Sequence, residues 1–291
     1  MKIQINAKIM LIISMVIFGT LGIFTRNIAI SSGELALYRA ILAAVLIFVY
    51  LIVTKQKTDF RSIKKELLLL LLSGTAMGIN WILLFEAYKY TTISAATLSY
   101  YFAPVIVIVA CPILFKEKLS GRQMICFLMS ALGLVLITGI GDLRNDNDFI
   151  GILFGLGAAL FYAAVILLNK FIKNVEGIYR TFLQFISAIV ILIPYVKMTS
   201  GVTLGNLNFT GWVNLLIVGF IHTGITYSMY FSSLKELPGQ KAAILSYIDP
   251  LVAVLISVAI LGETMTIWQA IGGVFILGFT LWNEISPETR S

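Results

Sequence analysis

The sequence predicts an all-α membrane protein in which ten transmembrane helices form two inverted five-helix repeats. Hydrophobic residues make up 59% of the 291 residues and charged residues only 12%, whereas a globular protein has about 25% charged residues. The apolar residues gather in stretches of about 20, the length that crosses a bilayer as a helix. One short sequence also occurs in two similar copies, AATLSYYFAP at 95–104 and AAILSYIDP at 242–250, called the repeated phrase below.

Ten stretches are long and apolar enough to cross the hydrocarbon core of a bilayer. In chain order they are 9–28, 35–54, 67–88, 93–115, 121–140, 149–171, 178–197, 211–234, 241–261 and 266–284. The first stretch lacks the small-residue cleavage site of a signal peptide, so we expect it to remain as a membrane helix. Cys111 and Cys126 lie inside such stretches and are expected to pack as small apolar residues.

The distribution of lysine and arginine predicts the orientation in the membrane, because cytoplasmic loops hold these residues in excess. With the N-terminus inside, the inner connections and termini carry 16 of them and the outer connections carry 4. We therefore expect a multi-pass protein of the cytoplasmic membrane with both termini in the cytoplasm.

The two halves of the chain align with their order kept, which predicts one repeat at 1–145 and a second at 146–291. The matching positions are Tyr38-Arg39 with Tyr179-Arg180, Gly74 with Gly219, Phe85 with Phe231, Lys89 with Lys235, Pro104 with Pro250, Glu117 with Glu263 and Gln123 with Gln269. Because each repeat has an odd number of helices, the second would be inverted in the membrane. Inverted repeats are typical of secondary transporters, which bind their substrate near the midplane.

The chain resembles the EamA type of the drug/metabolite transporter superfamily. The resemblance rests on Pro104 followed by Glu117, on Pro250 followed by LGE at 261–263, and on FGT at 18–20. It covers essentially the whole chain, although the first half has FKE at 115–117 where a glycine usually precedes the glutamate. The resemblance implies a membrane transporter, often a metabolite or amino-acid exporter, with helices 1–4 and 6–9 around a central cavity and helices 5 and 10 at the periphery.

Pro104 and Pro250 are expected to act as hinges near the middle of helices 4 and 9. A proline inside a helix removes a hydrogen bond and leaves a carbonyl four residues back without a partner; here these carbonyls belong to Tyr100 and Ser246. In a bilayer such broken backbone is tolerated against protein or a water-filled cavity. The alternative is a simple kink that aids packing.

Asp249 is an ionisable residue inside a predicted span, and such residues usually face a cavity or a partner. It is a candidate for proton coupling or for pairing with a positively charged substrate group. The structural alternative is that it braces the kink at Pro250 or pairs with a nearby tyrosine.

Several further residues within the spans are candidates for lining a substrate cavity. Polar and aromatic side chains inside a bilayer can hydrogen-bond a solute and stack on its apolar part. The candidates are Asn80, Trp81, Tyr100, Tyr101, Tyr162, His222, Tyr227 and Tyr247. Helix packing is the alternative for each of them.

Gly74 and Gly78 have the spacing that lets two helices approach closely.

Two arginines and two glutamates are expected to have structural roles. Arg39 and Arg180 are expected to snorkel to the interface or to pair with Glu34 and Glu176, and the alternative is that each attracts a substrate carboxylate. The glutamates at 117 and 263 precede the sequences Ser120-x-x-Gln123 and Thr266-x-x-Gln269. Both sequences are capping boxes that begin a helix.

These patterns together predict a secondary-active transporter of a small metabolite, an amino acid or related solute, that exports it by alternating access. A flippase or exchanger for lipid carriers or nucleotide sugars is the alternative, and an intramembrane enzyme is a weaker one. The one histidine excludes an H-E-x-x-H metalloprotease motif. We expect no metal and no cofactor. The expected partners are a small-molecule substrate and the lipid bilayer, without nucleic acid, and both monomer and homodimer remain open.

Overall fold

The computed structural model describes residues 6–25, 27–55, 60–90, 96, 99–116, 120–138, 146–175, 177–199, 201–261 and 267–285. Within these ranges the chain is helical and has no strand, which confirms the predicted all-α class. The elements are α1 (Ala7–Gly19), α2 (Leu21–Thr25), α3 (Ser32–Val53), α4 (Phe60–Tyr90), α6 (Ala103–Phe115), α7 (Gly121–Thr138), α8 (Asp146–Phe171), α9 (Gly177–Thr199), η1 (Leu204–Asn206), α10 (Phe209–Ile217), η2 (Val218–Ile225), α11 (Thr226–Glu236), α12 (Gly239–Leu245), α13 (Ile248–Leu261) and α14 (Ile267–Ile285).

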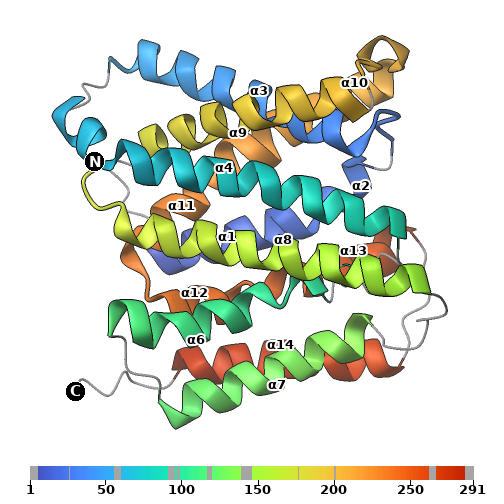
Figure 1. Cartoon of the computed structure of the whole chain (residues 1–291). Coiled ribbons are helices and arrows are strands. Elements are labelled where there is room, and N and C mark those ends of the chain that lie inside the picture. The colour runs from blue at the N-terminus through green and yellow to red at the C-terminus, as the bar shows by residue number, and fades with distance from the viewer. Residues whose placement is uncertain are drawn as a thin grey trace.

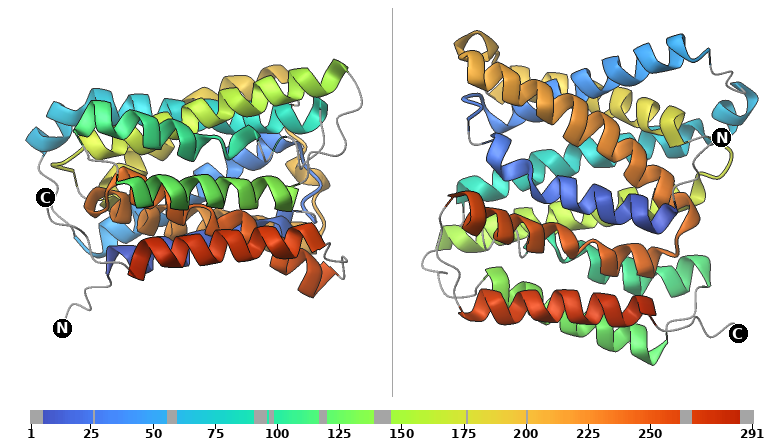
Figure 2. Two further views of the ribbon diagram at one scale, coloured as in Figure 1. Left: turned by 90° about the horizontal axis from the view of Figure 1, so that it is seen from below. Right: turned by 180° about the vertical axis from the view of Figure 1, so that it is seen from behind.

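The helices lie side by side in one bundle (Figure 1). Helix α4 belongs to the first half of the chain but packs mainly on α8 and α9 of the second half, and α3 packs on α9 and η2. Helices α7 and α14 pair at one edge of the bundle, as Figure 1 and the right view of Figure 2 show. These two are helices 5 and 10 of the sequence prediction, for which the resemblance implied a peripheral place.

Six helical stretches are long and apolar enough to cross a membrane. They are Ala7–Thr25, Ser32–Val53, Ile63–Ala87, Phe149–Phe171, Gly177–Thr199 and Phe209–Glu236. Three shorter apolar helices are Ala103–Phe115, Gly121–Leu136 and Ala270–Phe279. Large apolar side chains such as Val190 and Phe209 are exposed on the outside of the bundle, as a lipid-facing surface requires. The total of ten spans and the inversion of the halves stay predictions.

Four stretches that the sequence predicts as continuous helices have an irregular backbone. Thr20 separates α1 from α2, a turn at 101–102 precedes α6, a turn at 246–247 separates α12 from α13, and η2 is a π-helical segment within the stretch from α10 to α11. The two copies of the repeated phrase therefore break in the same manner. In each copy the helix restarts just before the proline.

Pro104 and Pro250 lie in the first turns of α6 and α13 rather than inside continuous helices. The first turn tolerates proline, because its N–H groups have no partner within the helix. The prediction that the Ser246 carbonyl is free is wrong, because this carbonyl accepts a hydrogen bond of 3.3 Å from the Asp249 amide. The helix of the second half is therefore broken rather than merely kinked, and the turn at the break supplies a hydrogen-bond donor to the Ser246 carbonyl.

Local sequence signals explain several helix starts. The Ser31 hydroxyl accepts from the Glu34 amide while the Glu34 carboxylate accepts from the Ser31 amide, a capping box that begins α3. Ser120 and Gln123 make the same pair of bonds at α7, as predicted. Residues 117, 176, 263 and 266, on which other predictions depend, lie outside the described residues.

Gly74 and Gly78 lie in the contact between α4 and α9, as their spacing predicts. A Cβ built on Gly74 would lie 2.6 Å from Cβ of Ser187, and one built on Gly78 would lie 3.4 Å from Cα of Ala188. Small residues thus let the two helices, one from each half, approach closely. Cys111 and Cys126 are both buried and neither forms a disulfide bond, as expected for packing residues.

Candidate functional site

The FGT motif at 18–20 lies where α1 meets the second half of the chain. The Phe18 ring lies edge-on to Tyr227, with centroids 4.9 Å apart. Gly19 packs so closely on α13 that a Cβ built there would lie 2.7 Å from the carbonyl oxygen of Asp249. The Thr20 hydroxyl lies 2.9 Å from Nε2 of His222. All three residues of the motif therefore contact residues of the candidate site.

Tyr227 of α11 lies at the centre of a cluster of aromatic rings. Its ring centroid lies 6.0 Å from that of Trp81 on α4 and 5.8 Å from that of Phe185 on α9. Trp81 and Phe185 are buried, whereas Tyr227 and Phe18 are partly exposed. The structure thus brings Trp81 and Tyr227 together and leaves part of the Tyr227 ring accessible.

A second cluster consists of tyrosines and adjoins the first. The hydroxyl oxygens of Tyr162 and Tyr230 lie 3.1 Å apart. Tyr100 stacks on Tyr162 at a centroid distance of 5.2 Å and meets Tyr101 edge-on at 5.4 Å. The ring of Tyr230 lies 6.3 Å from that of Tyr227, so the two clusters form one continuous aromatic region between α1, α4, α8 and α11.

Asp249 lies in the first turn of α13, beside the tyrosine cluster, and is partly exposed. Its carboxyl group lies beside the Tyr101 hydroxyl and interacts with it electrostatically. A carboxylate in a first helical turn is also stabilised by the helix macrodipole. The contact with Tyr101 matches the structural alternative expected for Asp249, which was pairing with a nearby tyrosine. Tyr101 belongs to the first copy of the repeated phrase and Asp249 to the second. The two broken helices therefore meet at this contact, and α6 packs on α12 beside it.

Arg39 neither snorkels nor pairs with Glu34, which corrects both expectations. It lies in α3, about 10 Å from the start of the helix at 1.5 Å per residue, and is only 5% exposed. Its Nε donates to the Thr223 hydroxyl at 3.1 Å, and its Cζ lies 4.6 Å from the centroid of the Trp81 ring. The Glu34 carboxylate is bonded to Ser31 and Thr203 instead.

Arg180 is fully buried and closes the end of α8 instead of reaching the interface. Its terminal nitrogens donate to the carbonyls of Asn169, Ile172 and Val175 at 3.2, 2.7 and 3.2 Å. Carbonyls at a helix C-terminus have no partner within the helix, so this side chain satisfies them. The expected interface position of Arg180 is corrected to a buried structural one.

Three other predicted cavity residues occupy different places. The Asn80 amide points inward but donates to the Ala158 carbonyl of α8 at 2.7 Å and is buried, so it joins two helices. Tyr247 is buried against Phe127 of α7, away from the other tyrosines. His222 holds Thr20 at the break between α1 and α2, and its ring packs on Phe24.

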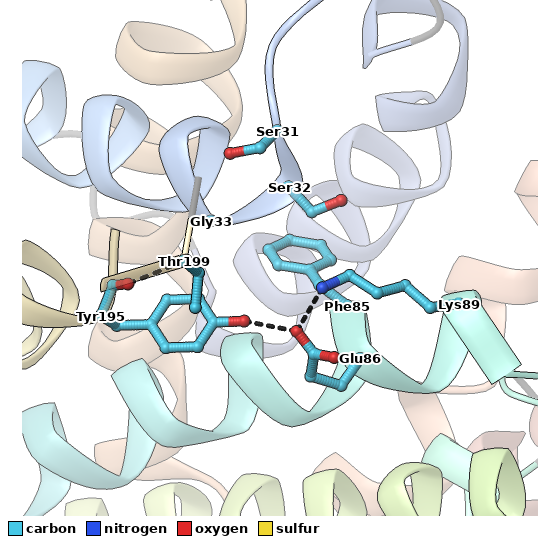
Figure 3. Close-up of a pocket in the computed structure, with 8 residues that line it drawn as sticks. All are labelled: Ser31, Ser32, Gly33, Phe85, Glu86, Lys89, Tyr195 and Thr199. Atoms are coloured by element: carbon cyan, nitrogen blue, oxygen red, sulfur yellow. Dashed lines mark hydrogen bonds and ion pairs between the residues drawn. The ribbon is translucent and has the colours of Figure 1, made fainter. Parts of the chain in front are cut away.

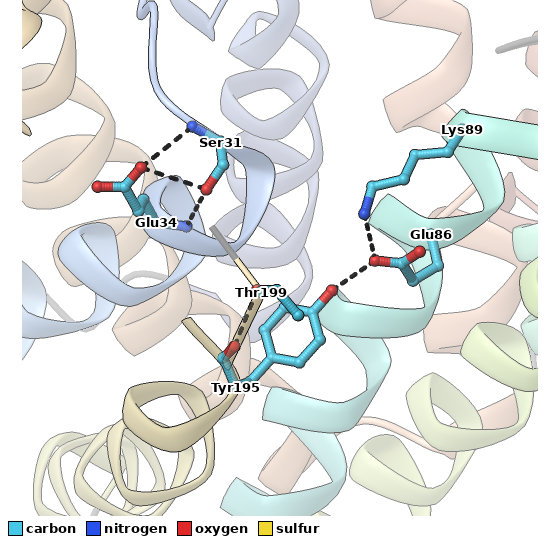
Figure 4. A network of polar contacts seen from close by, with 6 residues as sticks. All are labelled: Ser31, Glu34, Glu86, Lys89, Tyr195 and Thr199. Atoms are coloured by element: carbon cyan, nitrogen blue, oxygen red, sulfur yellow. Dashed lines mark hydrogen bonds and ion pairs between the residues drawn. The ribbon is translucent and has the colours of Figure 1, made fainter. Parts of the chain in front are cut away.

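A separate pocket of about 100 Å³ opens at the end of the bundle where α3 begins and α4 and α9 end (Figure 3). It is lined by Ser31, Ser32, Gly33, Phe85, Glu86, Lys89, Tyr195 and Thr199. The Glu86 carboxylate accepts from the Tyr195 hydroxyl and from Lys89, each at 2.5 Å (Figure 4). Glu86 belongs to the first half and Tyr195 to the second, so the halves are joined here. The predicted orientation places this pocket on the outer side.

Sequence reasoning did not select Phe18, Thr223 or Tyr230 for the site, and it gave Arg39 a peripheral role. Phe18 belongs to the FGT motif, which was noted for the resemblance alone. A charged residue in an apolar stretch is itself a signal, and it could have placed Arg39 in the centre. Thr223 carries no signal in the sequence, because its role depends on the π-helical turn. Among the described residues, no group of three potential metal ligands exists.

Comparison with known proteins identifies relatives along the whole chain. A model of the EamA-like transporter family matches twice, at residues 6–139 and 149–283. The uncharacterized transporter YxxF of Bacillus subtilis (strain 168) is 33% identical over 278 residues, covering 94% of this chain and 88% of that protein. An uncharacterized transporter of Archaeoglobus fulgidus is 27% identical over 278 residues, covering 94% and 95%. One solved crystal structure superposes with a TM-score of 0.84 at 14% identity over 94% of this chain and 95% of that chain, which shows the same fold.

Proposed function

This chain belongs to the EamA-like transporter family, and we propose that it is a secondary-active transporter that exports a small metabolite, an amino acid or related solute. The observation that carries the proposal is the contact between the broken helices of the two halves, where α6 packs on α12 and Tyr101 lies beside Asp249. This contact lies beside a partly exposed aromatic region. In transporters with inverted repeats, broken helices of this kind surround the substrate.

The solute binds between the halves, and the helices bend at 101–102 and 246–247 to open the centre to one side at a time. Two features support bending at these positions. The backbone already leaves the helical pattern there, and the prolines that follow cannot donate a backbone hydrogen bond to restore it. Tyr227 and Tyr162 supply aromatic faces and hydroxyl groups to the solute.

Contacts at both ends of α4 support two alternating closures. At the end predicted to be outside, Glu86 is bonded to Tyr195 of α9. At the opposite end, the Glu66 carboxylate accepts from the amides of Lys173 and Asn174 at 2.9 and 3.0 Å. Each contact joins the first half to the second. In the proposed cycle one of these contacts breaks while the other holds.

Asp249 is the proposed coupling residue. A carboxyl group that lies beside Tyr101 and is partly exposed can exchange its proton when the site opens. Protonation changes the Tyr101 contact between the two halves, which links proton movement to the conformational change.

Purified protein tests the proposal in two stages. Amino acids, other small metabolites, nucleotide sugars and lipid-carrier phosphates are compared by their effect on thermal unfolding, and those that bind are measured for flux in proteoliposomes. We expect a small metabolite to bind and to move across the membrane. Binding confined to lipid carriers would favour the flippase instead, and absence of flux for every bound solute would contradict the proposal.

Asp249→Asn tests the coupling. The variant should still move solute down its own gradient but lose the response to a pH gradient across the liposome. Glu236→Gln, which removes an exposed carboxylate at the end of α11, is the matched control and should respond fully. If Asp249→Asn keeps the full response, the coupling role is refuted.

A further inference from the structure

We propose that Arg39 is the anchor for a carboxylate group on the transported solute. The inference rests on the proposed function and adds to it a chemical class of substrate and a residue that selects it. It comes from the geometry around one buried cation in the aromatic region. For this residue the sequence favoured snorkelling or pairing with Glu34 and left a substrate carboxylate as the alternative.

The burial of Arg39 calls for an anionic partner that the described residues do not provide. A buried charge within a membrane protein is costly unless it is paired. Arg39 is 5% exposed, yet within the described part of the chain its hydrogen bond is to Thr223, and the ion pair found there joins Glu86 to Lys89. Its two terminal nitrogens, which carry the remaining N–H donors, have no partner among the described residues.

Arg180 provides the contrast within the same protein. It is also buried, but its terminal nitrogens donate to three backbone carbonyls. The protein itself therefore satisfies the outer edge of this arginine, although its Nε has no partner among the described residues. Arg39 differs because its hydrogen bond is made through Nε, which leaves the outer edge of the guanidinium group for a ligand.

The neighbours of Arg39 fix the orientation of that edge. The π-helical turn lets the Thr223 hydroxyl donate to the Val218 carbonyl at 2.8 Å and accept from Nε of Arg39 at 3.1 Å. The guanidinium carbon lies 4.6 Å from the Trp81 ring centroid and 5.9 Å from that of Tyr227. Cation–π contacts of this kind hold the guanidinium group in place and leave its N–H groups available for hydrogen bonds. The group is thus positioned before any solute arrives.

A planar carboxylate matches this arrangement, because its two oxygens accept two parallel N–H bonds from one guanidinium group. The rings of Trp81, Tyr227 and Phe18 lie close by. Their apolar faces favour an aromatic or other apolar group attached to the carboxylate. Tyr227 remains partly exposed and is the face on which that group would stack.

Chemical modification of the full-length wild-type protein tests the inference without a variant. Phenylglyoxal, which reacts with arginine side chains, is applied in detergent, and the modified peptides are identified by mass spectrometry. We expect Arg39 to react and Arg180 to resist. The probe 3-phenylpropanoate should slow the reaction of Arg39 about tenfold at about ten times its Kd, whereas 3-phenylpropanamide, its uncharged match, should not. An unreactive Arg39, or equal protection by acid and amide, would overturn the inference.

Binding measurements with variants separate charge from geometry. The wild-type protein should bind 3-phenylpropanoate about tenfold more tightly than the amide, and Arg39→Lys, which keeps the charge but loses the planar fork, should lose that preference. Lys89→Gln removes an exposed cation and should keep the preference. If phenyl phosphate protects Arg39 and 3-phenylpropanoate does not, the carboxylate assignment is wrong.

The two proposals fail in different ways. Protection of Arg39 without any solute flux would leave the anchor in place and refute the transporter mechanism. Flux of solutes that lack an anionic group, without protection of Arg39 by 3-phenylpropanoate, would refute the anchor alone.

Discussion

Tyr195→Phe is expected to loosen the closure at the end of the bundle predicted to be outside. The substitution keeps the ring of Tyr195 and deletes the hydroxyl that donates to Glu86 at 2.5 Å. Because Glu86 lies on α4 and Tyr195 on α9, the lost bond is one that joins the two halves of the chain (Figure 4). Opening of the pocket then requires one bond fewer to break.

The magnitude follows from the chemistry and exposure of that bond. A hydrogen bond to a charged group contributes about 1.5–3 kcal/mol. The Glu86 side chain is 19% exposed and also binds Lys89, so solvent and a second partner compensate part of the loss. We therefore expect about 1 kcal/mol, which is about a fivefold shift toward the open state.

The labelling rate of a cysteine in the pocket measures this shift. Ser32→Cys, in a background where Cys111 and Cys126 are replaced by alanine, places a thiol in the pocket lining. Its reaction with a maleimide in detergent should be about fivefold faster when Tyr195→Phe is added. Thr199→Val is the matched control, because the Thr199 hydroxyl bonds to the carbonyl of Tyr195 within its own helix. Equal rates with and without Tyr195→Phe, or an equal acceleration by Thr199→Val, would refute the reasoning.

Three further substitutions test the packing around α4 and α9 through the midpoint of thermal unfolding. Gly74→Ala should lower stability by about 1–3 kcal/mol because the new Cβ would lie 2.6 Å from that of Ser187, whereas Gly278→Ala, with open space around it, should be neutral. Glu66→Ala should lower the free energy of unfolding by about 3 kcal/mol and Glu66→Gln by about 1 kcal/mol. The smaller effect is expected because the glutamine oxygen can keep the bonds that Oε1 accepts from Lys173 and Asn174. Equal losses of stability in the two variants would contradict this account. Arg180→Leu should lower the midpoint without changing the preference for acid over amide ligands, and a changed preference would assign Arg180 to the site instead.

Much of the helical framework can be predicted because it depends on local properties of the chain. Apolar runs locate the helices, Ser120 and Gln123 mark a helix start, and Gly74 and Gly78 mark a close helix contact. The repeated phrase also indicated correctly where the backbone leaves the helix, since proline has the same effect in both copies. These signals act over one or two turns, and burial in the bundle does not alter them.

The arrangement of the site depended on neighbours that are distant in sequence. Arg39 looked peripheral because its depth in the helix and its aromatic neighbours on α4 and α11 cannot be read from α3 alone. Tyr247 and Tyr100 each directly follow a serine in the repeated phrase, yet Tyr247 packs on Phe127 of α7 and Tyr100 stacks on Tyr162 of α8. The copies differ by one residue before the proline. In a regular helix this would rotate corresponding side chains by about 100°, and the turns at 101–102 and 246–247 change their directions further.

The position of α4 has a consequence for how the protein is made. This helix is synthesised with the first half of the chain, but the helices on which it mainly packs, α8 and α9, emerge later. Until then the Glu66 carboxylate and the glycine face of α4 lack their final partners. A fragment that ends after α7 would thus expose surfaces meant for protein, so the first half is expected to be a substrate for membrane quality control until the second half is inserted. Neither half can be exchanged for a foreign one unless the residues that meet α4 are exchanged with it.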